Sequence, residues 1–234
     1  MKLVVLSSTV WGSVFIRENM NVSEARKSAG LKIYTGTLHR QWITLIQQEA
    51  GNTINDDNLL IDLDPDYVIS LGEAFSGKRS LEPGDIVISS EALYLDQQKP
   101  NILQGAAAEM KLVDLGIRAA EKFNNDERIC KVVVGKVFLD PGTAKTGRKL
   151  TFMPREDIYC LESNGYPMTK WVIERKYPFV LVKTIIPVWD RYGRLQITQF
   201  RWDTAKKNFW IVRGIFEGLK KMRLWETPGK VDLI

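Results

Sequence analysis

The chain has 234 residues, 44% of them hydrophobic and 26% charged, which are ordinary values for a soluble globular protein. This length accommodates a sizeable core, and we expect residues 1–234 to form one α/β domain. The net charge of +5 permits an anionic ligand, but without a long basic tract it makes a nucleic-acid partner unlikely. A membrane partner is excluded as well, because no segment approaches the roughly 18 apolar residues of a membrane helix.

The two cysteines, Cys130 and Cys160, lie far apart and lack the spacing of metal ligands. We therefore predict reduced thiols in a cytoplasmic protein, with no metal and no cofactor. The apolar run that begins at Lys2 is too short for a secretory signal and is typical of a first strand.

Apolar runs and apolar spacing predict the elements in chain order. The expected strands cover residues 2–6, 31–38, 42–46, 67–71, 85–89 with a continuation at 91–94, 131–139 and 177–183. The expected helices cover residues 106–123 and 203–222, a part of 157–176, and a short polar segment around 23–26. Strands that alternate with helices in this way indicate an α/β fold.

The most informative stretch is residues 66–96, which contains two short β-runs joined by a loop. The first run is expected to stop at Gly72, and small, polar residues follow as far as Pro83. A buried strand that ends in this way makes room for a ligand at the carboxyl edge of a sheet. Because glycine has no Cβ, the backbone at Gly72 can approach a bound group closely.

The same stretch resembles the core signature of the nucleoside phosphorylase and nucleosidase superfamily. Members have a strand, then Gly-Ser-Ala-Gly-Gly, then a loop to Gly-Asp, then a strand with Tyr-x-Asp. This chain has Gly72-Glu73-Ala74-Phe75-Ser76, Gly84-Asp85 and Tyr94-Leu95-Asp96, and it also has the family's hairpin sequence as Ile33-Tyr34-Thr35-Gly36. The resemblance implies a three-layer α/β sandwich with a central mixed, partly barrel-like sheet. It also implies a homo-oligomer that binds a small nucleoside-like ligand.

The resemblance carries over to several residues of a substrate site. Glu162, at an expected helix start, falls on the glutamate that grips the ribose hydroxyls, and Leu161 falls on the methionine beneath the sugar. Gly72 and Ala74 belong to the glycine-containing turn, and Lys183 replaces the family's arginine. We expect Glu162 and Gly72 to border one sugar-sized hollow.

Other family positions match less well. Gly51 corresponds to a turn whose amides face the ligand, and Phe138 lies in the segment that approaches the base. Pro187 stands where the family has the aspartate that protonates the leaving purine, so Asp190 is the candidate acid. The alternative is that Asp190 is a loop residue unrelated to the site. The residues around Gly12 give no match for the amino-terminal glutamate of the hydrolytic members.

Glu73 replaces the serine that contacts phosphate or the attacking water in the family. Two anions a few ångströms apart in a partly dry site would repel by several kcal/mol, which disfavours phosphorolysis. Glu73 would instead orient a water or pair with Lys183.

Two functions remain open from the sequence. One is a divergent nucleosidase that cleaves the N-glycosidic bond of a purine-like or modified nucleoside, more readily by hydrolysis than by phosphorolysis, with Glu162, Glu73 and Asp190 as its catalytic residues. The bond cleavage passes through an oxocarbenium-like sugar that a carboxylate stabilises. The other is a non-catalytic relative that binds a nucleoside, a nucleotide or a protein partner.

Overall fold

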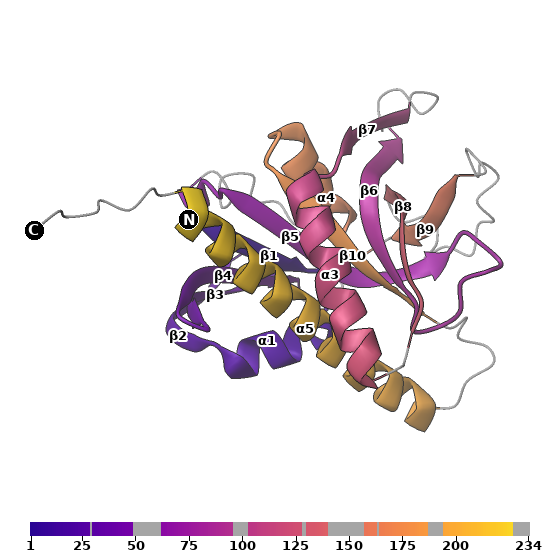
Figure 1. The fold of residues 1–234 in the computed structure, drawn as a ribbon, viewed down its shortest axis with the longest axis horizontal. Coiled ribbons are helices and arrows are strands. Elements are labelled where there is room, and N and C mark those ends of the chain that lie inside the picture. Colours follow the sequence, from indigo (N-terminus) through magenta and orange to yellow (C-terminus); the bar gives the residue numbers. More distant parts are fainter. Residues whose placement is uncertain are drawn as a thin grey trace, which may run out of the picture.

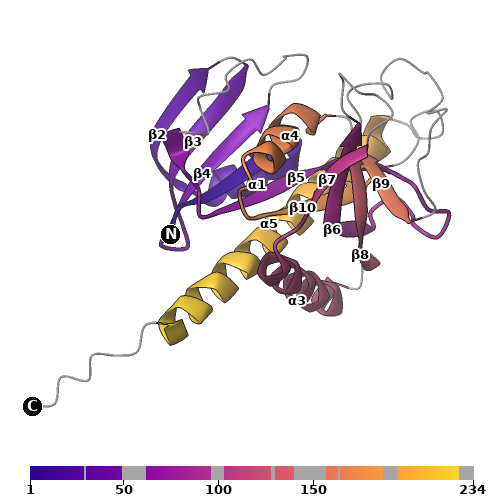
Figure 2. The same ribbon diagram turned by 90° about the horizontal axis from the view of Figure 1, so that it is seen from above.

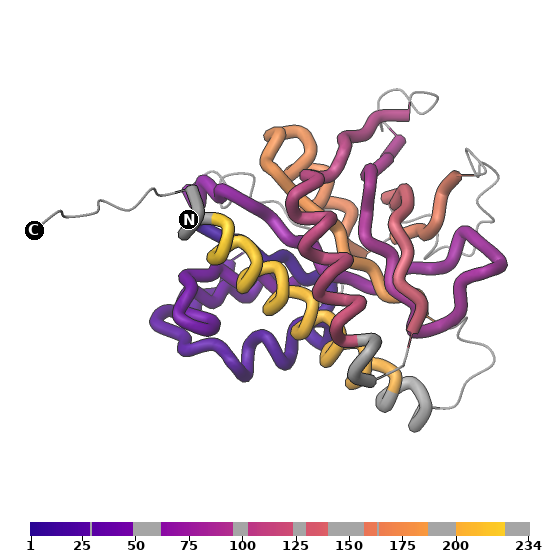
Figure 3. Tube along the Cα trace, in the orientation of Figure 1, coloured from indigo at the N-terminus to yellow at the C-terminus, as the bar shows by residue number. Residues whose placement is uncertain are grey.

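The computed structural model describes residues 1–28, 30–48, 62–95, 103–127, 130–139, 157–162, 164–186 and 194–226 (Figure 3). The strands are β1 Leu3–Ser7, β2 Asn21–Ser28, β3 Leu31–Leu38, β4 Gln41–Gln48, β5 Tyr67–Ser76, β6 Ile86–Leu95, β7 Leu103–Ala107, β8 Val132–Leu139, β9 Ile158–Glu162 and β10 Phe179–Ile185. The helices are the 3₁₀ turn η1 Trp11–Ser13, α1 Val14–Asn19, α3 Met110–Glu127, α4 Tyr166–Glu174 and α5 Arg194–Glu226.

The strands form one mixed sheet in the order β10-β6-β8-β9-β5-β1-β4-β3-β2, with β7 paired to β6. A further pairing between β10 and β5 closes the ring β5-β10-β6-β8-β9, so this half of the sheet is a small barrel (Figure 1). The other strands extend the sheet from β5. The expected mixed, partly barrel-like sheet is confirmed.

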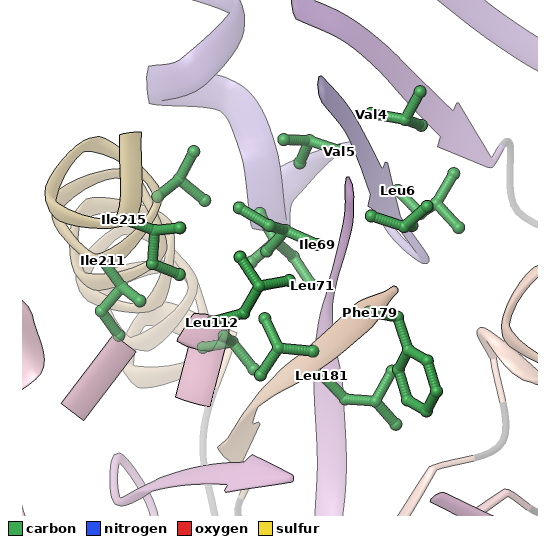
Figure 4. Packing of buried hydrophobic residues seen from close by; sticks show 14 of the residues in the cluster. Val4, Val5, Leu6, Ile69, Leu71, Leu112, Phe179, Leu181, Ile211 and Ile215 are labelled. Atoms are coloured by element: carbon green, nitrogen blue, oxygen red, sulfur yellow. The ribbon is translucent and has the colours of Figure 1, made fainter. Parts of the chain in front are cut away.

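Helices cover both faces of the sheet, as the three-layer prediction requires (Figure 2). On one face, Ile69 and Leu71 of β5 pack toward Leu112 of α3 and toward Ile211 and Ile215 of α5 (Figure 4). On the other face lies α4. Side chains alternate along β5, so its even-numbered residues face the α4 side and its odd-numbered residues face α5. This alternation decides which residues can share a site.

Strand β5 does not stop at Gly72, where the sequence predicted its end. It continues to Ser76 because β10 pairs with it as far as Ala74 and β9 pairs with its last two residues. Gly72 therefore lies inside a strand, and its missing Cβ serves the close approach of other groups rather than a turn.

Glu162 lies at the end of a strand and not at the predicted helix start. The run from Ile158 to Glu162 is strand β9, held between β8 and the end of β5. Helix α4 begins only at Tyr166, with Gly165 at its N-cap and Pro167 in its first turn. A proline is harmless there, because the N–H groups of the first turn have no partner inside the helix.

Two further segments differ from the expectation. The polar segment around residues 23–26 is not helical but belongs to β2, which pairs with β3 and lies at the edge of the sheet. Its exposed charges suit an edge strand, since they discourage pairing with other chains. The helix expected over 106–123 begins at Met110, because residues 103–107 pair with β6 as β7.

The remaining expected strands, including the hairpin of β3 and β4, are present. Within the described part of the chain, no helix combines the length and the hydropathy needed to cross a bilayer.

Candidate active site

The candidate site lies at a gap along one edge of β5. On this edge β1 pairs with β5 as far as Leu71, and β9 begins to pair with it at Phe75. None of the described strands pairs with the three residues between them, Gly72–Ala74, on this side. A place at the carboxyl end of a strand, where neighbouring strands diverge, is where α/β sheets bind ligands.

A buried ion pair lies beside the gap. Nζ of Lys183, which is opposite Gly72 in β10, lies 2.7 Å from Oε2 of Glu162, and both side chains are fully buried. The ammonium also donates to Oγ of Ser70 at 3.2 Å, and Ser70 shares a 3.2 Å hydrogen bond with Thr169 of α4. The lysine is therefore anchored between β5, α4 and the carboxylate.

Two glycines make room for the Glu162 carboxylate. A Cβ added at Gly72 would lie 2.5 Å from Oε1 of Glu162, 2.5 Å from Oγ of Ser8 and 3.1 Å from Nζ of Lys183. A Cβ at Gly165 would collide with Oε1 as well. Since real Cβ atoms do not approach other atoms this closely, both positions require glycine for the carboxylate to keep its place. The structure thus brings Glu162 and Gly72 together, as the sugar-sized hollow requires.

The two oxygens of Glu162 differ in their surroundings. Oε2 faces the lysine ammonium without a well-aligned hydrogen bond, whereas Oε1 has no hydrogen-bonding partner among the described residues. A buried carboxylate oxygen without a donor is costly, and buried polar groups in proteins are normally satisfied. Oε1 is therefore suited to accept a hydrogen bond from a hydroxyl group of a ligand.

Glu73 lies on the other face of the strand. Side-chain alternation directs it away from Gly72 and toward α5, next to Thr184 of β10 in the sheet register. Only 9% of its surface is exposed, and burial raises the pKa of its carboxyl group, although Arg201 of α5 lowers it. The alternative that Glu73 pairs with Lys183 is wrong, because Lys183 pairs with Glu162.

The raised pKa of Glu73 leads to a stability prediction. The folded protein binds this proton more tightly than the unfolded chain, whose carboxyl group keeps a value near 4.5. Stability is therefore expected to fall as the pH rises from that value through the raised pKa. Glu73→Gln should remove this slope and make the protein more stable at neutral pH, as measured by urea unfolding from acid to neutral pH. Identical slopes for the two proteins would contradict the assignment.

The remaining candidate residues fall into three groups. Ala74 is buried in β5, and its carbonyl accepts from the N–H of Ile186. Leu161 and Phe138 are opposite each other in β9 and β8 and share a small apolar cluster with Leu93 and Ile158, so Leu161 points away from its neighbour Glu162. The candidates Gly51 and Asp190, and the substituted position Pro187, lie outside the described residues.

The site contains residues that the sequence reasoning missed. Ser70 lies two residues before Gly72, so strand periodicity alone places it on the same face, and Gly165 lies three residues after Glu162. Thr169, in contrast, has no sequence signal that links it to the site. Within the described ranges, no group of three or more His, Cys, Asp and Glu side chains is arranged to hold a metal ion.

A closed five-stranded ring, a sheet that extends from it, and a buried carboxylate at the carboxyl edge of β5 define the protein as a mixed α/β protein with a partly closed central sheet. The sequence model of the Phosphorylase superfamily matches residues 3–148. The chain therefore belongs to this superfamily, and the fold has the expected nucleoside phosphorylase type.

Several relatives cover nearly the whole chain. A 5′-methylthioadenosine/S-adenosylhomocysteine nucleosidase of Staphylococcus carnosus is 24% identical over 219 residues, 88% of this chain and 95% of that enzyme. The solved nucleosidase of Colwellia psychrerythraea in complex with adenine superposes with a TM-score of 0.72 at 19% identity, covering 94% of this chain and 96% of that one. The futalosine hydrolase of Helicobacter pylori gives 0.70 at 14% identity, covering 93% and 98%.

Proposed function

We propose that the chain is a hydrolytic N-glycosidase that cleaves the bond between the sugar and the base of a purine-like or modified nucleoside. The observation that carries the proposal is the buried Glu162 carboxylate, held against Gly72 at the sheet gap, whose Oε1 has no hydrogen-bonding partner within the described part of the chain. A carboxylate in this position accepts hydrogen bonds from sugar hydroxyls and stabilises the positive charge that develops on the sugar. The sequence relatives and the structures of similar fold are nucleosidases and a futalosine hydrolase, which supports the same reaction.

We assign roles to the predicted residues within this proposal. Glu162 binds the sugar, Gly72 and Ala74 line the gap, and Lys183 fixes the orientation of Glu162. We keep Leu161 and Phe138 as candidate contacts of the base, although the apolar cluster that they form lies on the face of β9 opposite Glu162. We keep Asp190 as the candidate proton donor to the base and Gly51 as a candidate backbone contact.

The setting of the protein is also part of the proposal. Neither Cys130 nor Cys160 forms a disulfide bond, which supports a reducing compartment such as the cytoplasm. We keep the homo-oligomer as an expectation that follows from membership of the superfamily.

A second function is favoured by one specific contact. The Lys183 ammonium neutralises much of the charge of Glu162, and that charge is what an oxocarbenium-like sugar needs. A protein that binds a nucleoside without cleaving it would tolerate this neutralisation.

The proposal predicts base release without phosphate. The purified protein is incubated with adenosine, 5′-methylthioadenosine, S-adenosylhomocysteine and futalosine, with and without inorganic phosphate, and free base is quantified by chromatography. We expect release of base from at least one substrate in both conditions, and a reduction of about 10²–10³-fold in Glu162→Gln, as for the loss of one charge-stabilising group in other enzymes.

The other outcomes separate the two functions. Thermal stabilisation by a nucleoside without release of base would favour the binding protein. If none of the four compounds releases base and none raises the thermal midpoint, the proposed site is overturned.

A further inference from the structure

Two buried hydroxyl groups, those of Ser70 and Thr169, lie next to the Lys183–Glu162 pair. Ser70 precedes Gly72 by two residues in β5, so both residues are on the face of the strand that α4 covers. Thr169 lies in α4, and at most 3% of either hydroxyl-bearing residue is exposed. Their side-chain oxygens are 3.2 Å apart. The two hydroxyl groups therefore join the sheet to the helix directly beside the ion pair.

The Lys183 ammonium is divided between Ser70 and Glu162. An ammonium group has three N–H donors and no acceptor. One donor is directed to Oγ of Ser70 at 3.2 Å, and the same nitrogen lies 2.7 Å from Oε2 of Glu162. Because the lysine side chain is fully buried, bulk water does not replace either contact when it is lost. The position of the ammonium therefore depends on both acceptors.

Helix α4 fixes both sides of this arrangement. The N–H of Thr169 donates to the carbonyl of Gly165 at 2.9 Å, so the two residues are joined by one turn of the helix. Gly165 is also the residue against which Oε1 of Glu162 packs, since a Cβ there would collide with this oxygen. One helical turn thus places the carboxylate through Gly165 and the lysine through Thr169 and Ser70.

The bond to Ser70 opposes a movement of the ammonium toward Oε1 of Glu162. A Cβ at Gly72 would be 3.1 Å from Nζ of Lys183 and 2.5 Å from Oε1, so both atoms border the same small volume above this glycine. Ser70 and Gly72 are about 6–7 Å apart along the strand. A shift of Nζ into the volume above Gly72 therefore lengthens its bond to Ser70. An ammonium in that volume would also occupy the oxygen that is suited to accept a hydrogen bond from a ligand.

Resting on the proposed function, we infer that Ser70 and Thr169 are positioning residues, which hold the Lys183 ammonium at Oε2 of Glu162 and leave Oε1 to the sugar. Thr169 acts through Ser70, and Ser70 acts through Lys183, so neither hydroxyl group has to touch the reacting atoms. The arrangement explains how a neutralising lysine and a sugar-binding carboxylate share one site, because the lysine is kept at one of the two oxygens.

The first test compares Thr169→Val with Thr169→Ser. Valine has nearly the shape of threonine but cannot bond to Ser70, whereas serine keeps the hydroxyl group and loses the methyl group. We expect kcat/KM for nucleoside cleavage to fall by about 2–10-fold in Thr169→Val, the worth of one hydrogen bond, and to stay near the wild-type value in Thr169→Ser. A role in packing alone predicts the reverse order, because the serine variant leaves a cavity.

The second test does not depend on turnover. In a crystal structure of Ser70→Ala without ligand, Nζ of Lys183 is expected to move away from position 70 and to lie within hydrogen-bonding distance of both oxygens of Glu162. The matched control is Ser89→Ala. It removes a buried hydroxyl group that accepts from the N–H of Leu181, in the same strand as Lys183, at 2.8 Å. This control should leave both the position of Nζ and kcat/KM unchanged.

The outcomes distinguish the inference from the proposed function. A displaced ammonium in Ser70→Ala together with a lower kcat/KM in Thr169→Val supports both. A displaced ammonium in a protein that neither cleaves nor binds a nucleoside supports the positioning of Lys183 and overturns the proposed function. An ammonium that stays in place in Ser70→Ala overturns the inference. A larger loss of kcat/KM in Thr169→Ser than in Thr169→Val, or no loss in either, overturns the role of the Thr169 hydroxyl group.

Discussion

Removing one member of the Lys183–Glu162 pair is expected to cost about 3–5 kcal/mol of unfolding free energy, the range for a buried ion pair broken from one side. Both side chains are fully buried and their charged atoms are 2.7 Å apart. Among the described residues, the ammonium would keep only its bond to Ser70 in Glu162→Ala, and the carboxylate would lose its one charged partner in Lys183→Met. Urea unfolding of the purified variants measures both losses.

The double variant Glu162→Leu/Lys183→Met gives the sharper result. Replacing both charges by apolar groups removes their desolvation cost together with their attraction, so most of the lost stability should return. Under the proposed function, turnover should not return, because the carboxylate that we propose binds the sugar is absent. The difference between the double variant and the sum of the single variants gives the coupling energy of the pair.

The exposed pair Arg213–Glu217 on α5 provides the control. Its atoms are 2.8 Å apart, nearly the same distance, but the side chains are 33% and 46% exposed, so water reaches both charges. Glu217→Ala should therefore cost less than about 1 kcal/mol. A similarly small loss in Glu162→Ala would show that water reaches the Lys183–Glu162 pair, and would contradict the closed arrangement of the site.

A loss of activity in Glu162→Ala has two possible causes, loss of the carboxylate and loss of the fold. A variant that loses several kcal/mol can lose activity because it unfolds. The activity of Glu162 variants must therefore be measured at a temperature where circular dichroism shows them folded, and Glu162→Gln is preferable because it preserves the volume of the side chain.

Replacing Gly72 with alanine is expected to have the second largest effect. The added methyl group would lie 2.5 Å from both Oε1 of Glu162 and Oγ of Ser8, so the carboxylate must move. Overpacking of a close-packed region typically costs about 1–3 kcal/mol, and here it also displaces the oxygen that we propose binds the sugar. We expect lower stability, measured by urea unfolding, and loss of the thermal stabilisation by a nucleoside that the proposed function predicts for the wild type.

Gly116 of α3 is the matched control for this substitution. A Cβ at this position would meet Cδ1 of Ile88 at 3.4 Å, an ordinary contact. Because alanine is a better helix former than glycine, Gly116→Ala should be neutral or stabilising by up to about 1 kcal/mol. If Gly72→Ala behaved in the same way, the close packing around the Glu162 carboxylate would be disproved.

Local signals were sufficient to predict most of the strands. Continuous runs such as residues 67–71 and 179–183 are strongly apolar, and a strand buried on both faces has this pattern. The family signature then pointed to Glu162 and Gly72, which contact each other although 90 positions separate them in the chain. For these two residues the motif was informative because it records a spatial arrangement.

The errors have a common physical origin. Residues 23–26 have no strong strand signal, and β2 forms because the edge of β3 offers hydrogen bonds. Glu162 was assigned to a helix, but β8 and β5 bind the segment from Ile158 onward as a strand. In each case the pairing partner is far away in the sequence, so a local window does not contain the deciding interaction.

The sequence alone determined the α/β class, the superfamily resemblance and the identity of the central carboxylate, because these depend on composition, periodicity and short motifs. Only the tertiary structure decided that Lys183 pairs with Glu162 and that the Glu73 side chain points toward α5. Strand alternation and sheet register assign each side chain to a face, and register is set by contacts between distant segments. The chemistry available at the sheet gap therefore follows from how the chain is folded as much as from which residues it contains.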